Sequence, residues 1–231
     1  MGQMQALSLV VVMVILGFYG YYRLPETQFF KTRIQHAFGD DAQVYTVLFS
    51  RALGMLFFAI LPTAIIQVCC PQFFDVSYLQ WPAGSSAGYW IAGLLAAILP
   101  VIWVTSKKAA HLEQYPQIRK KAWSLTLLVI SALTWAGYLF AYEFLFRGLL
   151  FSLSLEALPL VWAVALNIVL YALVHWPKGK VEVLASIPFG LIIIWATIDS
   201  GTIWVAVIAH CALALSDEWF SLYHHPDIHL Q

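Results

Sequence analysis

The chain has 231 residues, of which 61% are hydrophobic and only 10% are charged. Soluble domains carry about a quarter charged residues, so this composition excludes an ordinary soluble domain. Basic and acidic side chains balance to a formal net charge of zero, which gives no indication of a nucleic-acid partner. We therefore expect an all-α fold, a polytopic membrane helix bundle whose outer surface contacts membrane lipids.

Three apolar runs in the N-terminal half predict membrane spans. The first, residues 6–22, has about the 17–25 residues that a helix needs to cross a bilayer. The second, about residues 44–66, is interrupted only by Arg51, which we expect to snorkel to the headgroups. The third, about residues 88–105, contains Pro100, which predicts a kink rather than an end of the helix.

Polar segments separate these spans. Residues 23–43 mix charged and apolar side chains, which predicts a loop with a short interfacial helix. Residues 67–87 contain Pro71 and Pro82 and are typical of a turn-rich linker. The strongly basic segment after the third span completes an N-terminal part, residues 1–122, of three helices with loops.

The C-terminal part, residues 123–231, contains four more apolar runs, which brings the expected number of spans to seven. The first of these runs, residues 123–153, is too long for one perpendicular span, so it must tilt, bend or overhang. The other three cover residues 159–176, 181–198 and 202–219.

The charges outside the spans predict the orientation of the chain. Lys and Arg fall in loops one, three and five, whereas loops two, four and six contain none. By the positive-inside rule the odd loops and the C-terminus are cytoplasmic, and the N-terminus lies outside.

A carboxylate and a guanidinium interrupt the long run at residues 123–153. Glu143 and Arg147 are four residues apart with the acid first, which favours a pair on one helical face. Charges at membrane depth are costly and usually serve a function. The alternative is a structural ion pair that locks two helices together.

Two later spans carry further polar side chains. Asn167, Tyr171 and His175 follow one another at intervals of four, so they share one helical face. His210 and Asp217 lie on one side of the last span. A single histidine is more often part of a packed core, but the set together predicts a reactive site.

The helical rise predicts which of these groups meet. If the outer ends of the spans share one level, Glu143 lies about 15 Å deep, His210 about 14 Å and His175 about 24 Å. Glu143 and His210 are therefore expected to meet, and His175 to lie about 10 Å lower unless its helix tilts.

One carboxylate and two imidazoles suit the activation of water, with Glu143 as general base and the histidines stabilising an oxyanion. We expect Glu143 to be the base because no other carboxylate of the late spans is comparably deep, and Tyr142 could at most donate a hydrogen bond. The same trio could instead hold zinc in a His₂Glu site, although no His-Glu-x-x-His motif is present. A third group of polar side chains lies near the C-terminus: His224, His225 and His229. The alternatives for this group are a metal-binding cluster and a solvated cytoplasmic tail.

Three motifs on the late spans, in their order, resemble those of the CPBP (CAAX protease and bacteriocin-processing, or Abi) intramembrane proteases. The family pattern is Glu-Glu-x-x-x-Arg, then Phe-x-x-x-His, then His-x-x-x-Asn or Asp. Here the motifs run from Tyr142 to Gly148, from Tyr171 to His175 and from His210 to Ala214. The resemblance covers about residues 120–219. It implies that the family's second glutamate, its arginine and its two histidines correspond to Glu143, Arg147, His175 and His210.

Two positions depart from the family pattern. Tyr142 replaces the first glutamate, often assigned as the base, and Ala214 replaces the final Asn or Asp. Either Glu143 is the base of a variant site, or the chain keeps the scaffold and has lost proteolysis. Glu182 offers a substitute carboxylate, or it is a helix N-terminal acid favoured by the helix dipole.

The resemblance implies an endopeptidase of the CAAX-processing type in a prokaryotic cell membrane. It would act on membrane-anchored or hydrophobic-tailed peptides. The resemblance does not establish any cofactor. A non-catalytic binding or immunity protein on the same scaffold is the alternative. A small transporter with a proton relay is a third, but it requires inverted repeats, and the sequence shows none.

Overall fold

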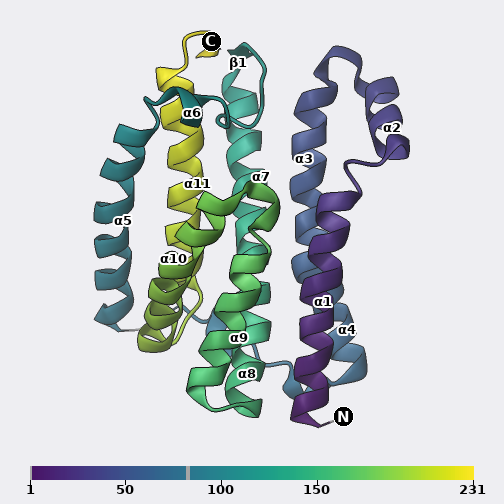
Figure 1. Cartoon of the computed structure of the whole chain (residues 1–231), viewed down its shortest axis with the longest axis vertical. Coiled ribbons are helices and arrows are strands. Elements are labelled where there is room, and N and C mark those ends of the chain that lie inside the picture. The colour runs from purple at the N-terminus through teal and green to yellow at the C-terminus, as the bar shows by residue number, and fades with distance from the viewer. Residues whose placement is uncertain (1, 82–83) are drawn as a thin grey trace.

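The computed structural model describes residues 2–81 and 84–231. This part of the chain is a bundle of long helices packed side by side (Figure 1). Seven of its helices are long and apolar enough to cross a membrane, so the all-α bundle and the number of spans are confirmed. Pro82 of the expected linker lies outside the described residues.

The N-terminal half begins with α1 (Gln3–Arg23) and the short helix α2 (Gln28–Phe38), which was expected at the interface. The second span is one long helix made of α3 (Ala42–Met55), the π-helical turn η2 (Leu56–Ile60) and α4 (Leu61–Cys69). The third is α5 (Ser85–Thr105), and the single turn α6 (Ala109–Leu112) follows it. Pro100 lies inside α5 and does not end it.

The C-terminal half begins at β1 (Ala122–Trp123) and α7 (Leu125–Glu143). The long run continues through the π-helical turn η5 (Phe144–Leu150) into α8 (Phe151–Ala157). The remaining elements are α9 (Leu160–Leu173), the 3₁₀ turn η6 (Trp176–Lys178), α10 (Lys180–Ser200), α11 (Trp204–His224) and β2 (His229–Leu230).

Helix α7 joins the two halves of the bundle. It packs against α3 on one side and α11 on the other, and α11 in turn packs along α5 (Figure 1). Gly54 of α3 permits this close approach, because a Cβ atom there would lie 2.3 Å from Cδ2 of Tyr138 on α7. The N-terminal helices are thus in direct contact with the helix that carries Glu143.

Arg51 does not reach the headgroups. Its side chain is 2% exposed and forms an ion pair with Glu218 of α11 at 3.0 Å. The guanidinium also donates to Ser131 Oγ at 2.9 Å, and its Cζ lies 4.1 Å from the centroid of the Trp135 ring. The predicted snorkelling was wrong because another helix supplies a buried carboxylate that compensates the charge.

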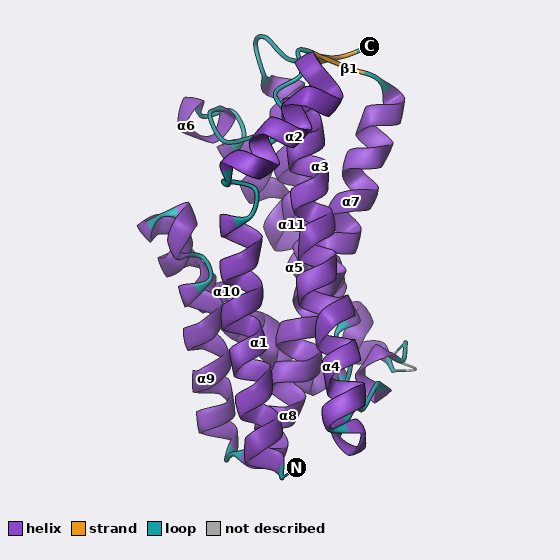
Figure 2. Cartoon of the chain, turned by 90° about the vertical axis from the view of Figure 1, so that its right-hand side faces the viewer, coloured by secondary structure: helices purple, strands orange, loops and turns teal. Residues whose placement is uncertain are grey.

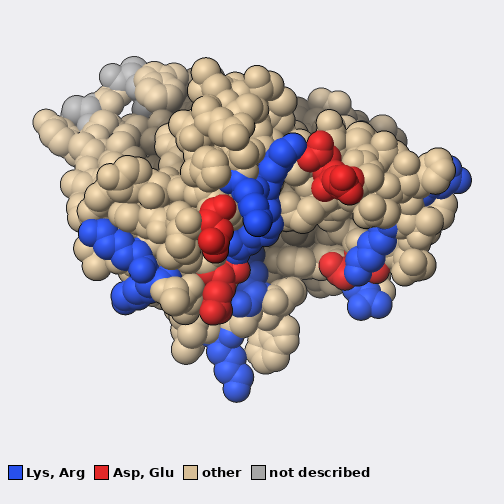
Figure 3. Space-filling view, turned by 90° about the horizontal axis from the view of Figure 1, so that it is seen from above, with Lys and Arg blue, Asp and Glu red and all other residues tan. Residues whose placement is uncertain are grey.

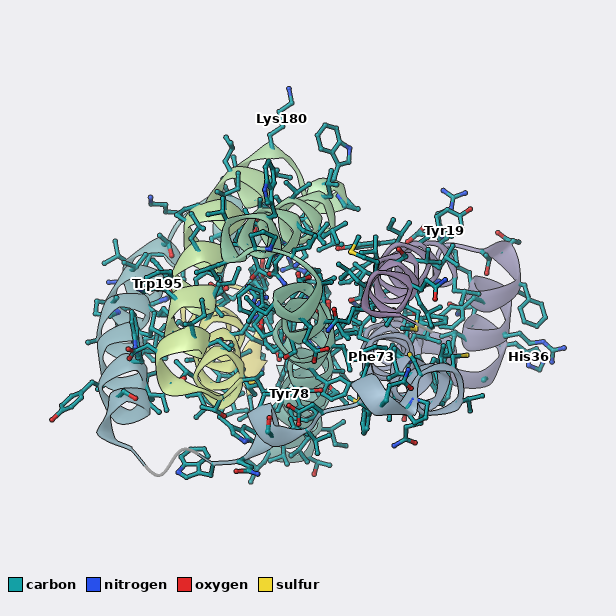
Figure 4. All side chains as sticks on the ribbon, turned by 90° about the horizontal axis from the view of Figure 1, so that it is seen from below. Tyr19, His36, Phe73, Tyr78, Lys180 and Trp195 are labelled. Carbon is teal, nitrogen blue, oxygen red and sulfur yellow. The ribbon has the colours of Figure 1, made fainter. Side chains whose placement is uncertain are left out.

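The basic loops face one end of the bundle. Seen from the end that carries the C-terminus, Lys and Arg side chains gather with Asp and Glu among them (Figure 3). Lys180, at the start of α10, points away from the bundle (Figure 4). The N-terminus lies at the opposite end (Figure 1). Which end faces the cytoplasm stays a prediction.

The C-terminal tail is held against the bundle. Strand β2 pairs in parallel with β1 (Figure 2). His224 Nδ1 lies 3.0 Å from Ser106 Oγ, and His225 Nδ1 accepts two backbone N–H groups of the tail itself. The tail is thus bonded to residues 106–123, while most of its residues after His225 remain exposed, as expected of a solvated tail.

Candidate active site

Glu143 is the last residue of α7, and its side chain is fully buried. Its Oε2 lies 3.1 Å from Nη1 of Arg147, which confirms the predicted pair. Its Oε1 lies 2.6 Å from Nδ1 of His210 on α11. The Cζ atom of Arg147 is 4.2 Å from the centroid of the Tyr171 ring, so a cation–π contact supports the same charge. One carboxylate therefore links α7, η5 and α11.

A π-helical turn follows Glu143 directly. The carbonyl of Phe146 accepts the N–H of Phe151, five residues further on. It also accepts the side-chain amide of Asn167 at 2.8 Å. Such turns are rare in proteins, but many of those that occur lie at functional sites. Asn167, expected in the polar stripe, thus bonds to the backbone of the neighbouring helix.

His175 lies just beyond the end of α9, at the start of the turn η6. Its Nδ1 is 2.7 Å from the carbonyl oxygen of Tyr171. Because a carbonyl only accepts, Nδ1 carries the hydrogen and donates it. The turn thus fixes the orientation of the ring.

A cavity of ≈ 380 Å³ lies between α5, α7, α9, α10 and α11. His175 and His210 both line it, so the structure brings together two of the three predicted residues around one space. Glu143 is not among its lining residues and meets the cavity only through His210. Much of the wall is aromatic or apolar: Tyr138, Leu139, Tyr142, Tyr171, Phe189, Leu213 and Ala214.

Both histidines lie near one tyrosine ring, and the expected offset in depth between them stays a prediction. The ring centroid of Tyr142 lies 5.4 Å from that of His210 and 6.3 Å from that of His175. One tyrosine ring therefore contacts both imidazoles.

Both imidazoles present the same nitrogen as an acceptor. A carboxylate accepts, so His210 carries its hydrogen on Nδ1, as His175 does. In the neutral rings Nε2 then holds a lone pair. Among the described residues, neither Nε2 atom has a hydrogen-bond partner. The pair can therefore accept hydrogens from a molecule in the cavity.

Polar side chains line another part of the cavity wall. Asp217 lies there on α11 with His210, as predicted, and Glu182 lies there in the first turn of α10. His111 Nε2, from α6, is 3.4 Å from Asp217 Oδ1. Burial lowers the pKa of His111, so this ring is neutral at pH 7. Lys178 also lines this polar part.

The residues do not fit a His₂Glu zinc site. Both oxygens of Glu143 are engaged, one by His210 and the other by Arg147. Within the described part of the chain, no group of three His, Cys, Asp or Glu side chains is placed to hold a metal.

The sequence did not indicate the role of Glu218. This carboxylate is fully buried, pairs with Arg51 and accepts the indole N–H of Trp135 at 2.9 Å. Glu218 is therefore as completely buried within the protein as Glu143. The signal was Arg51 itself, because an isolated charge within a span requires a partner.

The turn before α11 fixes the position of His210. Gly201 ends α10 in the left-handed conformation, with φ 67°. Thr202 Oγ1 then donates to the carbonyl of Tyr78 at 3.1 Å, and Trp204 Nε1 donates to that of Leu79 at 2.8 Å. The loop between α4 and α5 thus holds the start of the helix that carries His210.

Residues 122–216 match the family model described as type II CAAX prenyl endopeptidase Rce1-like, which confirms the expected family of CAAX proteases. The matched segment contains Glu143, Arg147, His175 and His210. No curated protein and no solved structure matches the chain. The seven apolar helices and this match together identify an integral membrane protein whose residues 122–216 are similar to the Rce1-like family of type II CAAX prenyl endopeptidases.

Proposed function

We propose that this protein is an intramembrane endopeptidase of the CAAX-processing type, in which Glu143 and His210 together activate water. The observation that carries the proposal is the 2.6 Å contact between Glu143 Oε1 and His210 Nδ1 at the wall of the cavity. The carboxylate is buried behind the ring, so it orients His210 and compensates the charge that the ring acquires.

The reaction follows from the two acceptor nitrogens. Water in the cavity gives one hydrogen bond to Nε2 of His210 and the other to Nε2 of His175. His210 removes a proton while the water oxygen forms a bond to the carbonyl carbon of the peptide. The C–N bond then breaks, and the leaving amine takes the proton from His210. Glu143 stabilises the protonated ring between these steps.

The aromatic and apolar wall favours a substrate with a hydrophobic or lipid-modified segment. A peptide that ends in a prenylated cysteine and three further residues is the substrate class that the family description supports.

An assay of the protein in liposomes tests this proposal. Release of the C-terminal tripeptide from such a peptide should occur with wild type and fall by about 10²–10⁴-fold in His210→Ala, the contribution typical of a general base. A chelator should leave the rate unchanged, because the donor set does not suit zinc. Complete loss of activity with chelator, restored by zinc, would contradict the glutamate–histidine mechanism.

The replacement of the first glutamate by Tyr142 favours a second candidate, a scaffold that binds hydrophobic-tailed peptides without cutting them. The same assay separates the two candidates. Binding of the prenylated peptide without any cleavage over long incubation would establish the non-catalytic function.

For the orientation, we propose that the end with the C-terminus is cytoplasmic, because the basic loops face it. Reporter fusions after Lys121 and after Gln231 should both report the cytoplasm. An external signal at either position would reverse the proposal.

A further inference from the structure

We propose that the Tyr142 hydroxyl is the oxyanion donor of this site, a catalytic role for the residue that stands in place of the family's first glutamate. The inference rests on the proposed peptidase function. It begins with an unpartnered group: Tyr142 is 3% exposed and lines the cavity, and its Oη has no hydrogen-bond partner among the described residues.

A buried hydroxyl without a hydrogen-bond partner is unfavourable, so its retention requires a reason. A ligand in the cavity provides one. The ring of Tyr142 stands at 87° to that of His210 and at 72° to that of His175. The side chain thus packs edge-to-face against both histidines that line the cavity.

The tautomers of the histidines make such a donor necessary. Attack on a peptide carbonyl places negative charge on its oxygen, which needs hydrogen-bond donors. His175 and His210 both donate through Nδ1 to protein acceptors, so their Nε2 atoms only accept while the rings are neutral. His210 gains a proton as the oxyanion forms, but it gives that proton to the leaving amine. The oxyanion therefore needs a donor from another side chain.

Two other aromatic donors that line the cavity are engaged elsewhere. The indole N–H of Trp135 donates to Glu218 at 2.9 Å, and the Tyr138 hydroxyl bonds to Tyr21. The position of the family's final Asn or Asp is Ala214, which has no polar side-chain atom. Tyr142 is thus a free O–H group beside both imidazoles.

Tyr142→Phe removes only this hydroxyl and tests the inference. We expect kcat for the prenylated peptide to fall by about 10²–10³-fold, as when one oxyanion donor is lost, with KM nearly unchanged. Tyr78→Phe is the matched control. Tyr78 Oη is also buried without a partner, but it lies on the segment between α4 and α5 (Figure 4) and does not line the cavity. The control should keep wild-type kcat.

A second measurement separates this inference from the proposed function. A peptide phosphinate carries a tetrahedral anion, and we expect Tyr142→Phe to weaken its binding by about 10²-fold or more, while binding of the matching uncleaved peptide is unchanged. If wild type cleaves the peptide and Tyr142→Phe cleaves it equally fast, the inference is overturned and the peptidase function stands. If wild type cleaves nothing yet binds the phosphinate in a Tyr142-dependent way, the peptidase function fails and the anion-donor role of Tyr142 holds. Equal phosphinate binding by wild type and Tyr142→Phe overturns the inference in either case.

Discussion

Glu143→Gln should lower kcat by about 10⁴-fold, the loss typical when the carboxylate behind a catalytic histidine becomes an amide. The carboxylate accepts the hydrogen of His210 Nδ1 at 2.6 Å and so keeps the lone pair on Nε2. An amide can donate to Nδ1 instead, which moves the ring hydrogen to Nε2 and removes the base. The measurement is kcat with the prenylated peptide, followed over a range of pH.

The matched control for this change is Glu218→Gln. Each substitution removes the carboxylate of a fully buried ion pair, Glu143 with Arg147 and Glu218 with Arg51. Both variants should lose stability, because each leaves an uncompensated guanidinium. Only Glu143→Gln should lose turnover in the molecules that remain folded. Equal losses of kcat in the two variants would mean that folding, not the orientation of His210, explains the effect.

Arg147→Ala should lower the free energy of unfolding by about 3–5 kcal/mol, the typical cost of breaking a buried ion pair by removing one partner. The guanidinium lies 3.1 Å from Glu143 Oε2 and over the ring of Tyr171. Both contacts disappear, and Glu143 retains its charge in a buried position with only His210 beside it. Equilibrium unfolding in mixed detergent micelles measures the change.

Arg147→Lys is the informative comparison for this second prediction. It keeps the positive charge but loses the planar group that stacks on Tyr171, so it should recover part of the stability. An unfolding free energy for Arg147→Ala equal to that of wild type would show that Arg147 is solvated instead of paired.

The fold was predictable from the sequence to a large degree because its signals are local. Apolar runs of bilayer length set the number of spans, and each predicted span lies within a few residues of a helix. The pair of Glu143 and Arg147 was predictable for the same reason, since residues four apart on a helix share a face. The π-helical turn η5 was not, because no local pattern marks it.

The candidate site was predictable only as a set of residue types. Glu143, His175 and His210 were singled out because polar groups in spans are costly. Their arrangement was not: Glu143 lies behind His210, and His175 lies in the turn after α9. The depth of a residue counted along its own helix cannot predict such contacts. The reach of the side chains and the crossing angles of the helices also decide which atoms meet.

The sequence by itself determined a seven-helix membrane protein, the loops that carry the basic residues, and the buried pair on α7 and η5. These depend on composition and on spacing within one helix. Only the tertiary structure decided that Arg51 pairs with Glu218 and that the Asn167 side chain donates a hydrogen bond to the Phe146 carbonyl. Only the tertiary structure also left the Tyr142 hydroxyl without a hydrogen-bond partner, on a ring that packs against both histidines. Each of these features depends on residues from different helices. Which helices pack together decides the partner of a buried charge or hydroxyl, and the sequence of a single segment does not determine that packing.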